Sequence, residues 1–201
     1  RRGGATSAQI IINSLDFAPI ARMQTEGRWK DAAAHLANAA QALERAGADI
    51  IAIGANTMHK VASQVMASVH VPLIHIGDTL VAGLRGHARS RPLLLGTRYT
   101  MEDPFMIDHL ANKGIGALVP DKADREALHA IIYDELIKGV VTDKSRETVL
   151  AMIEHSSARE ADSVIFGCTE IGMLFPPTEA GLPGYDTLEL HAEALVDFAL
   201  A

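Results

Sequence analysis

The chain has 201 residues, 48% of them hydrophobic, and its 18 Lys and Arg against 25 Asp and Glu give a net charge of -7. This composition suits one globular domain, or two small ones, with a real core, and it excludes a disordered chain. The acidic balance argues against nucleic-acid binding, and the apolar runs are too short to span a membrane. A single cysteine excludes a disulfide scaffold and a multi-cysteine zinc site.

Short apolar segments predict buried strands, and their near-continuous Ile, Val and Leu content is typical of parallel strands covered on both faces. We expect strands at Ala8–Asn13, Asp49–Gly54, Leu73–Ile76, Pro92–Gly96, Ala117–Pro120 and Ser163–Gly167. Helical periodicity predicts helices over Asp31–Gly47, Asn56–Val69, a segment opening at Thr100, Glu126–Gly139, Ser145–Ala158 and Leu188–Leu200. Strands that alternate with helices in this way indicate an α/β fold with a mostly parallel sheet.

Two stretches of the sequence repeat one pattern of a strand, a glycine, a small residue and two polar residues. They are residues 48–57 and 161–170, and each follows a predicted amphipathic helix. An internal repeat predicts two similar α/β halves whose strand ends meet across a cleft, where a ligand would bind. We expect the first half to comprise residues 1–76 and 185–201, and the second 77–184. The alternative is a chance recurrence of a common string.

Cys168 ends the strand of the second repeat, where the active sites of α/β proteins lie. Backbone N–H groups of the following turn could stabilise a thiolate there. An unperturbed thiol is only a few per cent ionised at neutral pH, so a modestly lowered pKa would make Cys168 a base or a nucleophile. A lone cysteine is also commonly a small buried apolar residue, and spacing alone leaves both interpretations open.

Three motifs follow one another along the chain: GANTMHK at Gly54–Lys60, LGTRYTME at Leu95–Glu102 and FGCTEIG at Phe166–Gly172. Together they resemble the aspartate/glutamate racemase family, and most of all its bacterial branch with L-aspartate/L-glutamate specificity. The resemblance implies two pseudo-symmetric α/β halves with the active site between them, a homodimer, and no PLP or metal. It also implies a small acidic amino acid as substrate. The sequence shows no secretory leader, so we expect a cytoplasmic protein.

The reaction of this family removes the Cα proton of an amino acid on one face and returns a proton on the other. Two groups on opposite faces perform it, and the resemblance makes Cys168 one of them. The matching position in the first half is Ala55. Alanine can neither accept nor donate a proton, so we expect slow or one-sided turnover.

Substrate binding carries over from the family to a set of polar residues at the predicted strand ends. They are Asn56, Thr57, Thr97, Thr100, Thr169 and Glu170. Asn56 and Thr100 are also good helix N-caps, and the sequence does not separate capping from binding. Arg98 and Lys138 are candidate partners for a side-chain carboxylate, although each can also be read as a solvated surface residue.

Two further expectations concern the limits of the resemblance. The family's N-terminal strand and glycine-rich loop are missing from the sequence, and we expect the full gene product to contain them. The single thiol also leaves two other functions open. One is a decarboxylase of the same superfamily, which protonates a planar intermediate from one side only. The other is a non-catalytic binding protein for acidic amino acids.

Overall fold

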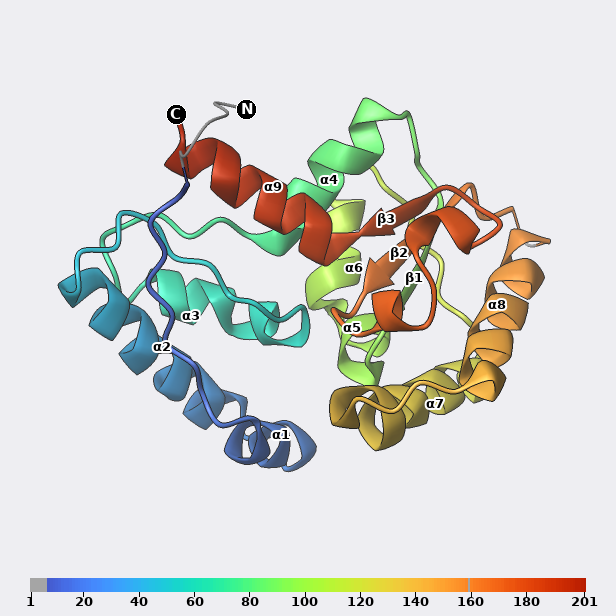
Figure 1. The fold of residues 1–201 in the computed structure, drawn as a ribbon, viewed down its shortest axis with the longest axis horizontal. Coiled ribbons are helices and arrows are strands. Elements are labelled where there is room, and N and C mark those ends of the chain that lie inside the picture. Colours follow the sequence, from blue (N-terminus) through green and yellow to red (C-terminus); the bar gives the residue numbers. More distant parts are fainter. Residues whose placement is uncertain (1–6, 159) are drawn as a thin grey trace. The chain divides into compact units, whose positions relative to one another are not determined.

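The computed structural model describes residues 7–158 and 160–201, and it divides into two compact units (Figure 1). Unit 1 consists of the described residues up to Ile53 together with Met58–His75 and Ala192–Ala201. Unit 2 consists of Gly54–Thr57 and Ile76–His191. The polar pair of the first repeat therefore lies in the same unit as the second repeat. The two pseudo-symmetric halves, with boundaries after residues 76 and 184, remain a prediction.

Unit 2 is built on a parallel sheet (Figure 1). Its strands, in spatial order, are β1 (Pro92–Gly96), β2 (Ser163–Gly167) and β3 (Gly184–Asp186). Every residue of β1 and β2 is buried, as their continuous apolar sequences predict. Gly96 lies opposite Gly167 in the register, so β1 and β2 end side by side. The predicted strands over these two ranges are confirmed.

Helices cover both faces of this sheet. They are α4 (Ile76–Gly86) and α6 (Pro104–Ala111) on one face, and α7 (Lys122–Ala130) and α8 (Asp143–Ser157) on the other. Leu93 and Leu95 of β1 belong to one buried cluster with Leu128 of α7 and Val149 of α8. Leu94 points to the opposite face because successive strand side chains alternate, and it joins the cluster formed with α4 and α6. Each fully buried Leu contributes about 1.5–3 kcal/mol, which makes this double-sided core the main stabilising feature of unit 2.

Unit 1 is mainly helical in its described part, with α1 (Phe17–Thr25), α2 (Trp29–Arg45) and α3 (Ala62–Met66). Helix α1 begins after Asp16, whose carboxylate accepts a hydrogen bond from Ala18 N at 3.1 Å. Helix α2 buries Leu36 and Ala40, and the chain leaves it through Gly47, which has a φ of 91°. The helix predicted over Asp31–Gly47 is thereby confirmed, with bounds shifted by two residues.

Shorter elements lie between these helices. They are η1 (Thr57–Val61), α5 (Arg98–Glu102), a π-helix η2 (Ile131–Glu135), η3 (Leu136–Lys138), η4 (Ile171–Met173) and η5 (Pro177–Glu179), and the last helix is α9 (Thr187–Ala199). The helix predicted over Asn56–Val69 is the turn η1 followed by α3. The helix predicted over Glu126–Gly139 is part of α7 followed by η2 and η3, and it ends at Gly139 in a left-handed conformation. Predicted helices near 145–158 and 188–200 are present as α8 and α9.

Several predicted strands are not strands in the structure. These are Ala8–Asn13, Asp49–Gly54, Leu73–Ile76 and Ala117–Pro120. Residues 8–13 form no regular element, and Ile10 and Ile12 are 75% and 81% exposed. The other three segments contribute only isolated parallel bridges, between Ile51 and Leu73 and between Leu93 and Leu118. Apolar content alone does not supply the continuous ladder of hydrogen bonds that defines a strand.

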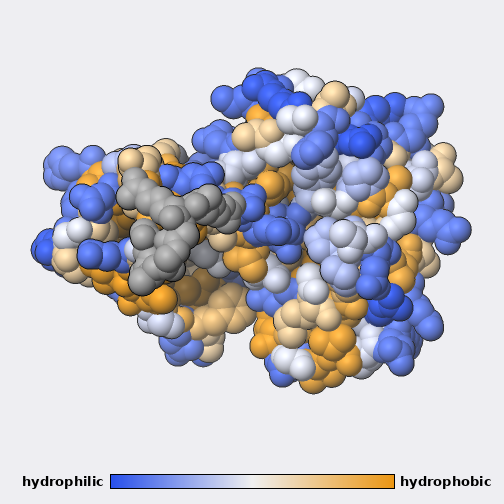
Figure 2. Space-filling model, turned by 45° about the horizontal axis from the view of Figure 1, so that its top comes forward, coloured by the Kyte–Doolittle hydropathy of each residue, from blue (hydrophilic) through white to orange (hydrophobic). Residues whose placement is uncertain are grey.

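The surface carries both hydrophilic and hydrophobic side chains. Figure 2 shows one face of the molecule, on which apolar residues form separate patches among hydrophilic ones. Exposed large apolar side chains include Phe17, Met173 and Phe198. Within residues 7–158 and 160–201, no helix combines the length and the apolar character needed to cross a membrane.

Candidate functional site

Cys168 lies directly after β2, and its thiol faces a carboxylate. Its Sγ donates a hydrogen bond to Glu170 Oε2 at 2.9 Å, and Thr169 Oγ1 donates to the same oxygen at 2.7 Å. Cys168 is only 7% exposed. Burial raises the pKa of the Cys168 thiol well above its usual value, and the negative charge of Glu170 raises it further. The thiol is therefore protonated at neutral pH.

The sequence prediction placed Glu170 and Thr169 among the substrate-binding residues. Both are half-buried, and both bond within the second repeat, to each other and through Glu170 to Cys168. A carboxylate in contact with a thiol can receive its proton, so Glu170 is placed to change the protonation state of Cys168. The negative charge of Asp186, at the end of β3, also raises the pKa of Cys168, by less than Glu170 does.

Three buried hydroxyl groups form a threonine cluster that consists of Thr57, Thr97 and Thr100. Thr57 Oγ1 lies 2.8 Å from Thr97 Oγ1 and 3.4 Å from Thr100 Oγ1, and Thr97 and Thr100 are 3.2 Å apart. Thr97 is also the N-cap of α5, where its hydroxyl accepts from Thr100 N at 3.3 Å. The three predicted binding residues are thus brought together from positions 40 residues apart in the sequence.

Two glycines permit this close arrangement at the ends of β1 and β2. A Cβ on Gly96 would lie 2.9 Å from Gly167 O and 3.1 Å from Thr100 Cβ. A Cβ on Gly167 would lie 2.5 Å from Leu95 O. Since real Cβ atoms do not approach backbone oxygens so closely, only glycine fits at position 167 without a backbone shift. The residue before Cys168 is fixed by packing.

Asn56 of the first repeat is held by a residue that the sequence analysis did not assign to the site. Asn56 Nδ2 donates to Thr187 Oγ1 at 2.8 Å, and Thr187 Oγ1 donates to Phe166 O of β2 at 2.8 Å. Asn56 and Thr187 are both buried. In the part of the chain that the structure describes, Asn56 Oδ1 has no hydrogen-bond partner. Thr187 directly follows β3, where the sequence analysis predicted no strand.

Ala55 is half-buried next to Asn56 and offers only a methyl group. It supplies neither a proton nor a charge, as the sequence predicted.

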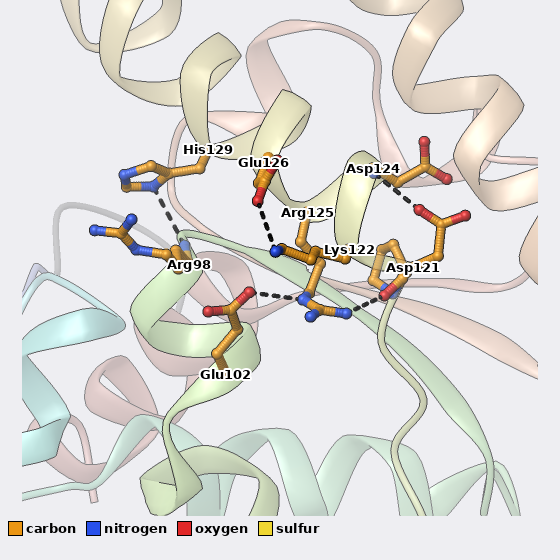
Figure 3. Close-up of polar contacts among 9 residues, drawn as sticks. Arg98, Glu102, Asp121, Lys122, Asp124, Arg125, Glu126 and His129 are labelled. Carbon is orange, nitrogen blue, oxygen red and sulfur yellow. Dashed lines mark hydrogen bonds and ion pairs between the residues drawn. The ribbon is translucent and has the colours of Figure 1, made fainter.

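Arg98 lies at the start of α5, beside His129 (Figure 3). The His129 ring also contacts the rings of Tyr99 and Tyr133. The backbone N–H of Arg98 donates to His129 Nδ1 at 3.3 Å, and its guanidinium carbon lies 5.4 Å from the centre of the Tyr99 ring. Burial lowers the pKa of His129, and the charge of Arg98 lowers it further. Burial raises the pKa of Tyr133, on which Arg98, Cys168 and Glu170 all act electrostatically.

Lys138, the other predicted carboxylate partner, is exposed in η3. Its Nζ lies 3.8 Å from Asp134 Oδ1, one helical turn earlier. That contact is a solvated ion pair of the kind that contributes little to stability.

Arg125 of α7 has a structural role. It donates to Glu102 Oε1 at 2.8 Å and to Pro120 O at 2.7 Å, and so ties α7 to α5 (Figure 3). Lys122 and Glu126 form an exposed pair at 3.8 Å on the same helix. Arg98 is not part of these contacts.

Two other features of unit 2 lie outside the predicted site. Asp121, Asp124 and His155 offer possible metal-ligand atoms within 4.8 Å of one another, but Asp121 already caps α7 by accepting from Asp124 N. A hollow of about 570 Å³ lies beside α8, lined by residues that include Leu150, Ile153 and Leu182. Neither feature contains a residue of the three motifs.

Comparisons with known proteins identify the relatives of this chain. A family model described as Asp/Glu/Hydantoin racemase matches residues 1–195. A solved structure from Yersinia pestis, proposed to be an Asp/Glu racemase, is 42% identical and has a TM-score of 0.91, covering 100% of this chain and 87% of that chain. An aspartate racemase homologue from Pyrococcus horikoshii OT3 is 34% identical with a TM-score of 0.81, covering 95% of this chain and 83% of that chain.

A curated relative is the broad specificity amino-acid racemase RacX of Bacillus subtilis (strain 168). It is 23% identical over 159 residues, which are 79% of this chain and 68% of RacX. These matches confirm the resemblance carried by the three motifs, and the parallel sheet flanked by helices confirms the α/β fold class. The prediction of an amino-acid racemase is confirmed at the level of the family. The chain belongs to the Asp/Glu/hydantoin racemase family.

Proposed function

We propose that this chain is a racemase for acidic amino acids, aspartate or glutamate, that needs neither PLP nor a metal and uses Cys168 as the one protein group that exchanges a proton with Cα. The observation that carries the proposal is the Cys168 thiol at the end of β2, hydrogen-bonded to the Glu170 carboxylate. The relatives named for aspartate and glutamate support the substrate class. The broad specificity named for RacX makes other amino acids necessary comparisons.

The protonation state of Cys168 decides which half of the reaction it performs directly. Its raised pKa keeps it as a neutral thiol, which can give its proton to the planar carbanion formed at Cα. To act in the opposite sense, the thiol first passes its proton to Glu170. The thiolate then takes the Cα proton, while the electron pair of the broken C–H bond stays on the substrate. The proton from Cα ends on sulfur, and the proton from sulfur ends on the carboxylate.

The carbanion needs hydrogen-bond donors at the α-carboxylate, where its negative charge develops. The threonine cluster offers three hydroxyl groups in one buried place. Each hydroxyl has one hydrogen and contacts within the cluster use some of them, so a hydrogen that the cluster does not use would be donated to the carboxylate. We assign the substrate α-carboxylate to this cluster.

Ala55 makes the proposed reaction one-sided. On the face that Cys168 does not serve, a water molecule must remove or return the proton. Water is a weaker acid and base than a positioned side chain, which typically contributes 10²–10⁴-fold to the rate. One enantiomer should therefore exchange its Cα proton faster than the other.

The side-chain carboxylate of the substrate requires a cation, and we favour Arg98 over Lys138. Arg98 acts electrostatically on the same tyrosine as Cys168 and Glu170, and a planar guanidinium can bind a carboxylate through two hydrogen bonds. Lys138 is already paired with Asp134.

Exchange of the Cα proton for deuterium, followed by NMR in D2O with both enantiomers of aspartate and glutamate, tests the proposal. We expect exchange of at least one enantiomer, and a loss of about 10²–10⁴-fold in Cys168→Ser. Serine is close in size and hydrogen-bonding capacity but far less acidic, so aspartate binding should survive. Exchange that persists in Cys168→Ser would remove the thiol from the mechanism.

Because Ala55 offers no proton-transferring group, the experiments must also distinguish the racemase from two other functions. A decarboxylase would release CO2 from malonate-type substrates and protonate the product from the Cys168 side alone. A binding protein would be stabilised against heat by aspartate, without any Cα exchange. Each outcome would replace the racemase proposal.

We also propose a homodimer in the cytoplasm, on the basis of the family alone. Light scattering after size-exclusion chromatography measures the mass of the assembly, and a mass of one chain would contradict the dimer.

A further inference from the structure

The hollow of about 570 Å³ beside α8 lies between that helix and the turn at residues 179–182, all within unit 2. We call it the α8 hollow, and its lining residues include Leu150, Ile153, Glu154, Ser157, Gly181 and Leu182. Its volume falls within the usual range of pockets that bind small molecules, about 300–1,000 Å³. Its lining residues lie outside the three motifs, so the hollow is not part of the proposed active site.

The floor of the α8 hollow is hydrocarbon. Four lining residues of α8, starting at Leu150, recur at the spacing i, i+3, i+4 and i+7, which places them on one face of the helix. Ile153 is 1% exposed and belongs to the core of unit 2, and Leu150 packs against that core. Leu182 of the turn packs against the same core. The hollow therefore presents an apolar surface to a ligand.

The turn borders the hollow without filling it, and Gly181 is the reason. Gly181 has a φ of 74°, in the left-handed region that favours glycine. In the described part of the chain, no atom other than those of its chain neighbours lies within 4 Å of the place where a Cβ on Gly181 would be. The hollow thus remains open beside the turn.

The rim of the hollow carries negative charge. In the part of the chain that the structure describes, its lining includes the carboxylates of Glu154 and Glu179 and no cationic side chain. Glu179 already accepts a hydrogen bond from Arg146 Nη2 at 2.8 Å. Glu154 has no such partner among residues 7–158 and 160–201. It also lies in the last turn of α8, where the helix dipole adds partial negative charge, so the rim attracts one cation.

We propose that the α8 hollow binds a small organic cation, an ammonium group on a short alkyl chain, with the chain on the apolar floor and the ammonium beside Glu154. The two parts of this ligand match the two parts of the hollow. A neutral chain of the same length would lack the contact with Glu154, and an anion would be repelled by it. The proposal does not depend on the proposed function, because the hollow contains none of the residues assigned to proton transfer or to the substrate.

NMR of the methyl-labelled protein tests the proposal with n-hexylamine, 1-hexanol and heptanoate, which share one alkyl chain and differ in charge. We expect hexylamine, which is protonated at neutral pH, to shift the methyl signals of Leu150, Ile153 and Leu182 saturably. It should bind about two- to fivefold tighter than hexanol, the size of one partly exposed ion pair, and heptanoate should bind most weakly. Equal affinities for hexylamine and hexanol, tighter binding of heptanoate, or no shift of these methyl signals would overturn the proposal.

The length of the chain tests the apolar floor separately. Each methylene removed from the amine, from hexylamine to propylamine, should weaken binding by about two- to fourfold. Affinity that does not change with chain length would show that the floor takes no part in binding, which would contradict the proposal.

A change of charge at the rim tests the role of Glu154. Glu154→Gln should reduce the affinity for hexylamine to that for hexanol and leave the affinity for hexanol unchanged. Glu147→Gln is the matched control, because Glu147 is an exposed carboxylate on the same helix outside the lining of the hollow. A preference for hexylamine that survives in Glu154→Gln would contradict the role of Glu154.

Filling the hollow tests its location and keeps this inference apart from the proposed function. Ser157→Phe should abolish the shifts caused by hexylamine, whereas Ala151→Phe, on an exposed part of α8 outside the lining, should keep them. Shifts that persist in a folded Ser157→Phe protein would overturn the assignment to this hollow. If hexylamine binds as described and the protein exchanges no Cα proton, the racemase proposal fails and the inference stands. If the protein exchanges the proton and does not bind hexylamine, the reverse holds.

Discussion

The first repeat end, Gly54–Thr57, and the second repeat end, Gly167–Glu170, share a sequence pattern and differ in structure. The second follows β2, which is buried along its whole length, and a Cβ on Gly167 would lie 2.5 Å from a backbone oxygen. The first follows a segment with one isolated bridge at Ile51, and a Cβ on Gly54 would meet nothing within 4 Å. One repeat end is fixed by packing, and the other has room around its glycine.

The two repeat ends also differ in their chemical groups, and the tightly packed end carries the reactive ones. The packed end carries a thiol and a carboxylate in contact, whereas the open end carries a methyl group and an amide. Burial and a fixed neighbour set the pKa of an acid or base, and the packed end provides both. Under the proposed function, both repeat ends would bind the substrate, and proton transfer by a side chain would be confined to the packed end.

The largest effect should come from giving the open end the group that it lacks. Ala55→Cys places a thiol at the position that matches Cys168, so inversion of aspartate should accelerate by about 10²–10⁴-fold. Chiral chromatography measures inversion, and deuterium exchange measures proton removal on either face. Ala123→Cys, on the exposed side of α7, controls for an added thiol. An Ala55→Cys protein that binds aspartate but inverts it no faster would contradict a mechanism in which one group on each face of Cα transfers a proton.

The second prediction tests the packing difference itself. Gly167→Ala forces Leu95 O or the strand to move, and we expect the free energy of unfolding to fall by about 1–3 kcal/mol. Gly54→Ala, at the matching position, should change it by about 0.5 kcal/mol or less. Urea denaturation of both variants measures the difference, and equal stabilities would contradict the contrast between the two ends.

The third prediction concerns the pH dependence of stability at the packed end. The thiol pKa is raised in the folded state, so Cys168 contributes stability below the pKa of the unfolded chain, about 8.5, and this contribution is lost as the pH rises further. Glu170→Gln removes a negative charge beside the thiol and should lower its pKa. The loss of stability between neutral pH and about pH 9.5 should then be smaller.

Carbon-13 labelling of the single cysteine gives the pKa directly, through the chemical shift of its Cβ during a pH titration. Glu147→Gln, an exposed carboxylate on α8, is the matched change of charge and should leave the titration as it is. A thiol pKa that rises or stays constant in Glu170→Gln would refute the electrostatic role of Glu170.

The smallest effect should separate the two candidate cations. Arg98→Gln should raise KM for aspartate about tenfold, which is the size of one charged hydrogen bond, with little change in kcat. Lys138→Gln should change KM by about twofold or less, because Lys138 is paired with Asp134 in solvent. Steady-state kinetics of the two variants decide between them, and the reverse order of effects would assign the substrate carboxylate to Lys138.

The sequence predicted the parts of the fold that depend on burial on both faces. Strands β1 and β2 were placed correctly because each contains a run of three apolar residues, Leu93–Leu95 and Val164–Phe166. The segment 8–13 also has a run of three apolar residues, Ile10–Ile12, and forms no strand in the structure, since composition does not say whether a neighbouring strand is there to pair with it. Strand β3 has only three residues, too few for any periodicity to be read.

Residues within the three motifs could be named from the sequence. Contacts that depend on side-chain orientation, or on residues far apart in the sequence, could not. Thr57, Thr97 and Thr100 were named from their motifs and lie in hydrogen-bond contact. The contact between Glu170 and the Cys168 thiol follows from a side-chain orientation that no spacing rule gives. Thr187 was missed because its role depends on Asn56, 131 residues away in the sequence.

The hydrogen bond from Cys168 to Glu170 also bears on how long the protein stays active in an oxidising setting. Peroxides and electrophiles attack thiolates, and a sulfur kept neutral by burial and a nearby carboxylate reacts slowly with them. With one cysteine in the sequence, an oxidised sulfur has no second thiol in the chain to rescue it as a disulfide. If Cys168 is the proposed acid and base, lasting activity depends on preventing damage to this one atom, and the proton on sulfur slows that damage.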